Sequence, residues 1–478
     1  MTLQDQNNGT PVSELQSILA EIAPQSIFAD IKQNKGANWT PRFLVQCVFL
    51  WTTCNLPTLT ESFAYAFRLF LALQPDFEKP TATFMGFIGQ LAKYHDSIKE
   101  RIIPYLRELG KTKLKQYFQC GKFFLLAIDG SENQTPRTKE NIQRFGAGTK
   151  KKKRKRKYNR RTNTTTNVDK QEKKKRKSKR KKQSKKDREK KANTPLLALT
   201  LLYHLTSGLP WNWRIGGAAS SERSHAKEMI GETPENTVFV ADAGFTGYRF
   251  MKYIIDAGRH FIIRVGANVR FLKGLCPYER RGNIVYLWPN WAAKASLPPL
   301  VLRLVQVKDG NQEMFLVTTL QETEMTELEI EEVYRRRWGI EVFFRTFKQT
   351  FEKRKMKSRN PDHAVVELEW SLISLWVMCL YGKESLMASG KLPSRLSPAK
   401  AIRAFQSAQW EYGLPVTDRK QLLSHKLSCA VMDDYKRKSE KTNRQYPRKR
   451  QKKAIGKPKI CKATKTQKHA AKLIRHAS

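Results

Sequence analysis

The spacing of apolar residues along the chain changes character near residue 119. Between residues 12 and 118, apolar side chains recur with a helical period, in runs such as Phe43–Cys54 and Phe84–Ala92, and prolines separate the runs. Beyond residue 119 many runs become short and almost continuously apolar, as in buried strands. The pattern therefore predicts a helical N-terminal domain over residues 1–118, followed by a region that contains a sheet.

Strand-like runs alternate with helical ones up to residue 265. Two of the predicted strands end in an acidic residue, since KFFLLAID ends at Asp129 and TVFVAD ends at Asp242. Such a succession predicts a mixed α/β sheet. The other elements predicted here are a pair of strands within 195–216 that turns at Ser207-Gly208, helices at 221–230 and 248–257, and a strand at 260–265.

The remaining sequence divides by pattern into three ordered segments. Residues 266–323 contain the runs IVYLW, LVLRLVQV and EMFLVTT, which predict a small β-rich insertion. Residues 324–390 begin with a helix near Thr326 and include the mostly apolar stretch Ala364–Tyr381, which we expect to lie buried against the sheet. Residues 391–434 are predicted to be helical. The sheet-forming core would then comprise 119–149, 192–265 and 324–390.

One predicted helix, Tyr334 to Phe351, places polar groups of several kinds on one face. At about 100° per residue, the side chains of Tyr334, Arg337, Glu341 and Lys348 project within an arc of about 60°. An ordinary amphipathic surface helix would explain charges at helical spacing, but not a single Glu surrounded by an excess of cations and aromatic residues. Beside this face lies an apolar stripe made of Val333, Ile340, Phe344, Phe347 and Phe351.

The formal net charge of +47 is concentrated in two segments. Residues 150–191 hold 25 Lys and Arg against 4 Asp and Glu, and residues 435–478 hold 17 against 1. Both are poor in apolar residues, so we expect them to be disordered when free and to bind a polyanion. Nucleic acid is favoured over a membrane surface, because neither segment shows a basic amphipathic helix with a Trp or Leu face. The helical residues 1–118 are then either a scaffold or a reader of DNA ends.

Several other functions are disfavoured by the sequence. The seven cysteines contain no Cys-x2-Cys pair, which argues against a zinc site or a disulfide framework and favours a reducing compartment. His225 and Glu228 lie one helical turn apart without a third zinc ligand. No Gly-x4-Gly-Lys-Ser/Thr motif occurs, so we expect no ATP dependence. Glu367 and Glu369 interrupt the longest apolar stretch and the N-terminus lacks an export signal, so neither a membrane span nor export is expected.

Three acidic residues are the candidate catalytic residues and metal ligands: Asp129, Asp242 and Glu341. Either aspartate alone is more often a turn former or a helix cap. Neighbouring strands bring their ends together, however, and a helix packed over that edge can present Glu341 to both. Three carboxylates without His or Cys favour Mg²⁺ or Mn²⁺. Two such ions would activate a water or a 3′-hydroxyl and stabilise the leaving oxygen, which amounts to cleavage and joining of DNA.

Over roughly residues 40–390 the chain resembles the DDE transposases of the insertion-sequence-four family. The family signature Tyr-x2-Arg-x3-Glu-x6-Lys matches Tyr334, Arg337, Glu341 and Lys348, and the motifs IDGSENQ and ADAGFTGYRF around the two aspartates are also similar. The resemblance implies a ribonuclease-H-like mixed-sheet catalytic core with a β-rich insertion. It also implies cut-and-paste transposition by a homodimer on double-stranded DNA, with Tyr334, Arg337 and Lys348 binding the DNA end near the scissile phosphate.

Some members of this family form a hairpin intermediate and hold a flipped base on an aromatic residue of the insertion. Trp288 and Trp291 are the candidates for that role here, although neither matches a motif. The sequence departs from the family in the basic insertion 150–191 and in the basic C-terminus. The insertion either tracks DNA near the active site or is a low-complexity expansion, which loop-closure entropy tolerates.

Two alternative functions stay open at this point. One is a nuclease of the same fold that cleaves without strand transfer, and the other is a catalytically inactive, transposase-derived DNA-binding protein. The complete set of three acids and the complete helix signature argue against decay. The resemblance points to a prokaryotic host and to a cytoplasmic, nucleoid-associated location.

Overall fold

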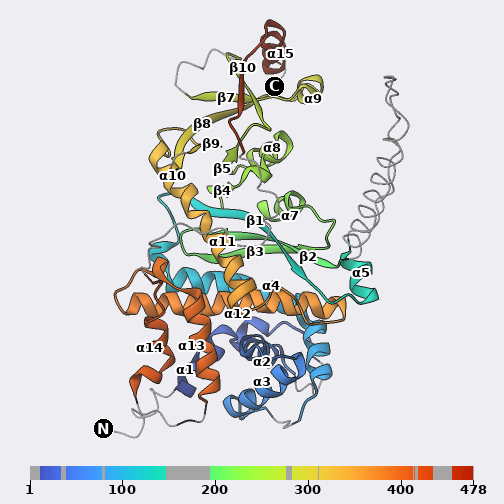
Figure 1. Ribbon diagram of the computed structural model, residues 1–478, viewed down its shortest axis with the longest axis vertical. Coiled ribbons are helices and arrows are strands. Elements are labelled where there is room, and N and C mark those ends of the chain that lie inside the picture. The colour runs from blue at the N-terminus through green and yellow to red at the C-terminus, as the bar shows by residue number, and fades with distance from the viewer. Residues whose placement is uncertain are drawn as a thin grey trace, which may run out of the picture.

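The protein consists of a helical layer packed against one face of a long, mixed β-sheet (Figure 1). A computed structural model of the chain describes residues 11–33, 39–77, 81–146, 194–275, 283–309, 312–412, 414, 418–433 and 455–476. The mixed α/β class predicted from the sequence is confirmed. The basic insertion 150–191 lies outside the described residues.

Helices from both ends of the chain form the helical layer. The long helix α12 contacts α2 and α4 of the N-terminal region and α13 and α14 of the C-terminal region. The predicted helical regions 1–118 and 391–434 therefore share one core, although they are far apart in sequence. The helices of the layer are α1 (Pro11–Ile22), α2 (Pro41–Cys54), α3 (Leu59–Leu73), α4 (Phe84–Lys113), α12 (Pro361–Ala388), α13 (Pro398–Trp410) and α14 (Leu423–Ser428), with the short turns η1 (Gln25–Phe28), η2 (Lys115–Tyr117), η6 (Pro393–Arg395) and η7 (Arg419–Gln421).

The sheet has ten strands in the order β10-β6-β7-β8-β9-β5-β4-β1-β2-β3. The pairs β1–β4, β4–β5 and β10–β6 are parallel, and the other pairs are antiparallel. The strands are β1 (Phe124–Gln134), β2 (Leu196–His204), β3 (Leu209–Gly216), β4 (Thr237–Ala241), β5 (His260–Val265), β6 (Arg270–Lys273), β7 (Ile284–Leu287), β8 (Leu300–Asp309), β9 (Gln312–Thr318) and β10 (Lys459–Lys462).

The elements predicted between residues 195 and 265 are confirmed. Strands β2 and β3 form an antiparallel pair whose turn places Gly208 at a φ of 65°, a conformation that glycine adopts without steric cost. The helices of this part of the chain are short. They are α5 (Lys139–Phe145), α7 (Glu222–Ile230), η3 (Ala243–Phe245), α8 (Tyr248–Asp256) and, in the insertion, α9 (Asn290–Lys294).

The β-rich region 266–323, predicted as a small insertion, is part of the core sheet. Its last strand, β9, pairs antiparallel with β5, so the insertion lengthens the core sheet instead of forming a sheet of its own. The physical reason is that β5 would otherwise present an unpaired edge, whose backbone donors and acceptors β9 satisfies. The insertion is therefore held at a fixed position beside the strands that carry the aspartates.

Strand β1 is longer than its apolar run. The prediction ended the strand at Asp129, but β1 continues to Gln134 because β2 supplies antiparallel partners up to the pair Gln134–Leu196. Only the parallel pairing with β4 stops at Ile128, opposite Ala241. Asp129 thus lies at the end of a pairing and not at the end of a strand, so that part of the prediction was wrong.

The predicted helix Tyr334–Phe351 is interrupted twice. α10 (Glu327–Arg336) and α11 (Trp338–Arg345) meet at Arg337, and a π-helical turn, η5 (Thr346–Thr350), follows. A constant 100° per residue therefore does not hold across the segment, because the π-turn uses a hydrogen bond five residues long, from the Phe351 N–H to the Thr346 carbonyl. The apolar stripe is nevertheless buried along its whole length.

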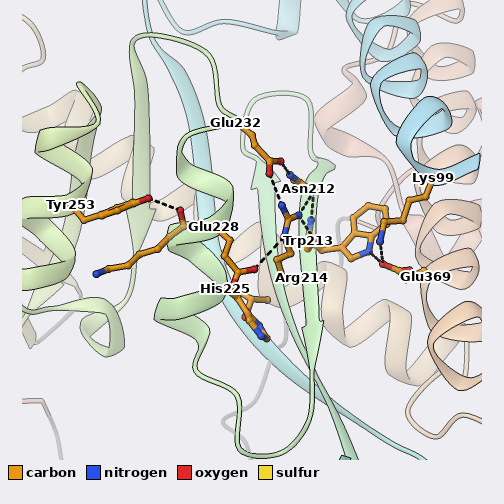
Figure 2. A network of polar contacts seen from close by, with 11 residues as sticks. Lys99, Asn212, Trp213, Arg214, His225, Glu228, Glu232, Tyr253 and Glu369 are labelled. Carbon is orange, nitrogen blue, oxygen red and sulfur yellow. Dashed lines mark hydrogen bonds and ion pairs between the residues drawn. The ribbon is translucent and has the colours of Figure 1, made fainter. Parts of the chain in front are cut away.

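Side chains of β3 alternate between the two faces of the sheet, as Figure 2 shows. On one face, the Trp213 indole donates to the Glu369 carboxylate of α12 (2.7 Å), which also accepts from Lys99 of α4 (2.8 Å). On the other face, Arg214 and Asn212 contact Glu232, just beyond α7. This network ties the helical layer, the sheet and α7 together.

Helix α12 is long and apolar enough to cross a membrane by length and composition alone. In the structure, however, 94% of its most apolar stretch is buried between β3 and the other helices of the layer. Its apolar character is therefore explained by packing. Glu367 and Glu369, which interrupt the stretch, are both buried and hydrogen-bonded.

The expected disorder of 435–478 is wrong for residues 455–476. There, strand β10 pairs in parallel with β6 and is followed by the amphipathic helix α15 (Lys465–His476). The segment buries little apolar surface, which alone would not offset the entropy lost when it becomes ordered. Backbone hydrogen bonds to the open edge of the sheet at β6 supply the remaining stabilisation. Ala471 is buried, and Ala470 and Ile474 also pack against the core. Residues 434–454 lie outside the described part of the chain.

Candidate active site

Strand register brings the two predicted aspartates together. Ile128 of β1 lies opposite Ala241 of β4, and each is followed directly by an aspartate, Asp129 and Asp242. Asp242 caps the short turn η3, its Oδ1 accepting from the Gly244 N–H at 2.7 Å. The sequence prediction that these carboxylates are neighbours is consistent with this register. The register arises because the apolar runs of β1 and β4 pair in parallel along their length, up to the residues that precede the aspartates.

Asp129 lies in an unfavourable setting for a carboxylate. The pKa of Asp129 is raised to about 6, and burial is the largest cause. The nearby Asp242 and Glu341 also raise this pKa, whereas the Gly130 N–H and Arg337 lower it. The Gly130 N–H donates to Asp129 Oδ1 at 2.8 Å. Perturbed pKa values of this kind gather at functional sites.

Glu341 is held by a cation from the same segment. Arg337 donates to Glu341 Oε1 at 2.7 Å, one helical turn away, and both side chains are largely shielded from solvent. Helix α11 packs against β1, so Glu341 is presented toward the strand that carries Asp129. Burial lowers the pKa of Arg337, but the charges of Tyr334, Glu341 and Asp129 raise it overall. The ion pair therefore joins the helix to the carboxylate site.

Tyr334 and Lys348 complete the predicted set. The Tyr334 ring is buried and lies 5.6 Å from the Arg337 guanidinium, in a cation–π contact. Burial lowers the pKa of Lys348, while Glu132 and Asp129 are close enough to raise it. All six predicted residues are thus in one electrostatic neighbourhood, even though the helix geometry that predicted them is not uniform.

Sequence reasoning missed three charged residues beside this site. Glu132 lies on the part of β1 beyond Asp129, and Glu222 of α7 places its carboxylate where a side chain at Gly130 would stand. Partial burial raises the pKa of Glu222, and Asp242 and Glu132 raise it further. Arg223 donates to the carbonyl oxygen of Gly244, two residues after Asp242. The glycine that follows Asp129 was the signal available in the sequence, because it indicates a close approach.

The donor set suits a hard divalent cation in its chemistry, since it offers carboxylate oxygens and neither His nor Cys. The side chains are not gathered around one point, however. Within the described ranges, no group of three or more His, Cys, Asp and Glu side chains is close enough to hold a metal ion. Glu341 is instead paired with Arg337. The assignment of these carboxylates as metal ligands therefore stays a prediction.

The histidine and glutamate considered for zinc are occupied elsewhere. His225 Nδ1 contacts the Thr200 hydroxyl at 3.1 Å, and Glu228 pairs with Arg214 at 3.5 Å, so the two point to different partners (Figure 2).

A cleft of about 960 Å³ lies between α7, α8 and the insertion, and its lining includes Thr246 and Gly247, which directly follow η3. We call it the basic cleft, and its charged and indole-bearing lining residues are Arg223, Lys227, Arg249, Arg270, Trp288 and Trp291. Trp288 is 4% exposed and donates its indole N–H to the Leu297 carbonyl, whereas Trp291 is 42% exposed. Both aromatic residues singled out in the insertion therefore lie in this cleft, but only Trp291 offers an exposed ring.

Comparison with known proteins gives a consistent family. A model described as the transposase DDE domain matches residues 124–377. A putative transposase for insertion sequence element IS4SA of Synechocystis sp. is 24% identical over 184 residues, covering 37% of this chain and 51% of that protein. Transposase InsG for insertion sequence element IS4 of Escherichia coli K12 is 26% identical over 215 residues, covering 42% of this chain and 48% of that protein. The match spans about half the length of these curated relatives.

A solved structure of a piggyBac transposase synaptic complex with hairpin DNA also aligns with the chain. The alignment covers 93% of this chain and 90% of that one, with a TM-score of 0.37 and 11% sequence identity. A likeness at this level carries no argument about fold or function.

Proposed function

Since the chain belongs to the transposase DDE domain family, whose model matches residues 124–377 of its 478, we propose that it is a transposase that cuts and joins DNA strands at the ends of an insertion sequence. The observation that carries this proposal is the register of β1 and β4, which puts Asp129 and Asp242 side by side with α11 packed on β1. The residues that the family model matches include Asp129, Asp242 and Glu341.

In this proposal Asp129, Asp242 and Glu341 are both the catalytic residues and the metal ligands. Bound Mg²⁺ or Mn²⁺, as two ions, would supply activation of a water or a 3′-hydroxyl and stabilisation of the leaving oxygen. Positive charge at this place would also relieve the mutual repulsion that raises the pKa of Asp129. Glu341 would have to exchange its ion pair with Arg337 for the shared site.

Tyr334, Arg337 and Lys348 would bind the DNA end near the scissile phosphate. Support comes from the Arg337 guanidinium, whose Nε is buried without a hydrogen-bond partner among the described residues. An unsatisfied buried donor is costly unless a ligand completes it, and a phosphate oxygen would do so. Lys348, near Asp129, would add a second positive charge.

The finer description of the fold belongs to this proposal as well. The order β5-β4-β1-β2-β3, with β1 parallel to β4 and antiparallel to β2, supports a ribonuclease-H-like core that β9 and its neighbours extend. We infer a homodimer that bridges both element ends on double-stranded DNA, independent of ATP and of membranes. A cytoplasmic, nucleoid-associated location follows from that role.

The test is cleavage of a DNA that carries the element's own ends. Purified wild-type protein is compared with Glu341→Ala, in Mg²⁺ or in EDTA, on a denaturing gel. We expect metal-dependent nicks at the element boundary and joined products from the wild type, and neither from the variant. Glu332→Ala is the matched control, because Glu332 is an exposed glutamate on α10 whose one ion pair among the described residues is with Arg336.

The outcomes separate the competing functions. Nicks without joined products would favour a nuclease of the same fold. DNA binding without cleavage in any metal would favour the inactive DNA-binding protein. Equal loss of cleavage in the Glu341 and Glu332 variants would mean that the effect is not specific to the proposed site.

A further inference from the structure

The basic cleft is lined by α7, α8, β6, the segment from β7 to α9 that carries Trp288 and Trp291, and one further part of the chain. Arg223 and Lys227 come from α7, Arg249 comes from the first turn of α8, and Arg270 comes from β6. The further part is α15, which contributes Gln467 from the C-terminal segment. A region expected to be a disordered tail therefore forms part of a defined surface.

The charge of this cleft is of one sign. Its lining contains four cations and, among the described residues, no carboxylate. Arg249 lies over the Trp291 ring at 4.7 Å, and within the same described set neither Arg249 nor Arg270 forms an ion pair. Both arginines are exposed. Such cations attract a polyanion, and planar guanidinium groups suit phosphate in particular.

The cleft is continuous with the turn that carries Asp242. Thr246 and Gly247, four and five residues after Asp242, line it, and Arg223 reaches from it to the Gly244 carbonyl. A DNA backbone that leaves the carboxylates in this direction would meet the cations of the cleft. The cleft itself contains none of the six residues predicted from the sequence.

The C-terminal segment is fitted to its place in detail. The Ala267 N–H donates to the Ile455 carbonyl (3.0 Å), and β10 then pairs with β6 over four residues. A side chain at Gly266 would overlap the side chain of Ile455, so close approach requires glycine there. Gly456 has a φ of 72° and also needs glycine. These constraints indicate a built contact and not a chance one.

We propose that the segment β10–α15 is the outer wall of a DNA-binding cleft, in which Arg249 and Arg270 hold backbone phosphates of the DNA beyond the carboxylate site. This inference rests on the proposed function, from which DNA is taken as the partner. It assigns the C-terminal segment a role in binding that its low apolar content does not suggest.

The phosphate contacts are tested by the salt dependence of binding. A labelled duplex carrying one element end is titrated in EDTA between about 50 and about 200 mM salt, where each phosphate contact contributes about 0.9 to the slope of log affinity against log salt. We expect the full-length double variant Arg249→Ala/Arg270→Ala to flatten the slope by about 2. The matched control is Arg68→Ala/Arg403→Ala, which removes two exposed arginines from the helical layer.

A slope that is unchanged, or flattened no more than in the control, would overturn the assignment of these arginines. Because binding is measured in EDTA, the result does not depend on cleavage. If the wild type makes no metal-dependent nicks but the arginine variant flattens the salt slope, the proposed function fails and the cleft assignment stands. If the wild type cleaves DNA but the slope is unchanged in the variant, the cleft assignment fails and the proposed function stands.

The wall is tested by releasing the segment. Gly266→Val should displace Ile455, and Ala471→Asp, which introduces a charge at the buried contact of α15, gives the same release by a different route. Hydrogen exchange should show lost protection of residues 455–476, together with several-fold weaker DNA binding at equal salt. If a variant keeps the rest of the fold and releases residues 455–476 but binds DNA with unchanged affinity, the segment is not a wall of the DNA-binding cleft.

Discussion

At the scale of single residues, Asp129 shows the conflict between stability and function. Its carboxylate is half-buried, close to Asp242 and Glu341, and its pKa is raised to about 6 chiefly by burial. Such an arrangement costs folding free energy in the absence of a cation. A site evolved only for stability would not place carboxylates in this way, so the arrangement favours a functional reason.

Asp129→Asn keeps the shape of the side chain and removes its charge. We expect the variant to be more stable than the wild type by about 0.5 to 2 kcal/mol in EDTA, because the burial of a charge and its repulsion from Asp242 and Glu341 are both removed, and to lose all metal-dependent cleavage. Urea unfolding measures the first effect and the gel assay the second. Asp256→Asn, at an exposed ion pair with Lys252, should change neither. A destabilised Asp129→Asn protein would contradict the electrostatic argument.

Glu369 shows the opposite situation, in which neighbours favour the charged form. Burial alone raises the pKa of this carboxyl group, but the hydrogen bonds and charges of His95 and Lys99 lower it to about 2. A carboxyl group with a depressed pKa contributes stability above its unfolded pKa of about 4.5. That contribution is lost as the pH falls from about 4.5 toward 2.

Glu369→Gln should therefore be destabilised at neutral pH and should lose less further stability on acidification. We expect the difference in unfolding free energy between the wild type and the variant to be about 2 to 3 kcal/mol smaller at pH 2 than at pH 7. Urea unfolding across that pH range measures this difference. Glu108→Gln, at an exposed pair with Lys111, is the control and should show no such trend. Parallel pH profiles for wild type and Glu369→Gln would refute the assigned role.

At the scale of elements, α10 begins the helical segment that carries Tyr334, Arg337 and Glu341, the proposed site residues. It begins with a capping box in which the Thr326 hydroxyl accepts from the Glu329 N–H and Glu329 accepts from the Thr326 N–H. These contacts satisfy backbone donors that the first turn of a helix leaves free. The cap therefore fixes the beginning of the segment that carries Tyr334, Arg337 and Glu341.

Thr326→Ala removes this cap without touching the site. We expect a loss of about 1 kcal/mol in unfolding free energy, measured by denaturant titration, and increased hydrogen exchange in the first turn of α10. Thr112→Ala, an exposed threonine in the last turn of α4, removes the same atoms without a capping role. If the two variants lose equal stability, the capping box does not have the expected effect.

At the scale of the whole molecule, positive charge is distributed beyond the site. The described C-terminal segment docks next to the basic cleft, and Lys457 pairs with Glu313 of β9 there. The basic insertion 150–191 joins β1 to β2, the strand pair beside Asp129. The insertion therefore lies, in the chain, next to the strand pair that carries Asp129, whereas the C-terminal segment docks on β6, at the opposite end of the sheet from β3.

Deletion of residues 150–191 tests the function of the insertion. We expect a flatter salt dependence of DNA binding, because lysines and arginines that displace counterions are lost, while metal-dependent cleavage stays intact. Replacement of the insertion by an uncharged Gly/Ser linker of equal length separates charge from loop length. An unchanged salt slope would favour the low-complexity alternative.

The sequence determined the local structure and the identity of the site. Short, almost continuously apolar runs gave the strands β2 to β5, and apolar residues with a helical period gave the helices α7 and α8, because burial of an element depends on residues close in sequence. Asp129 and Asp242 were predicted from the ends of two apolar runs and Glu341 from its spacing within a helix, and the family resemblance supplied the predicted roles of Tyr334, Arg337 and Lys348. Their chemistry also limited the metal to hard cations.

Only the tertiary structure decided what depends on distant partners. The extension of β1 past Asp129, the pairing of β9 with β5 and the docking of β10 on β6 each require a strand that is remote in sequence. Backbone pairing offers no local apolar pattern, so such contacts leave no periodic signal. For the same reason the closeness of Glu222 to Gly130 and the basic cleft emerged only from the folded chain.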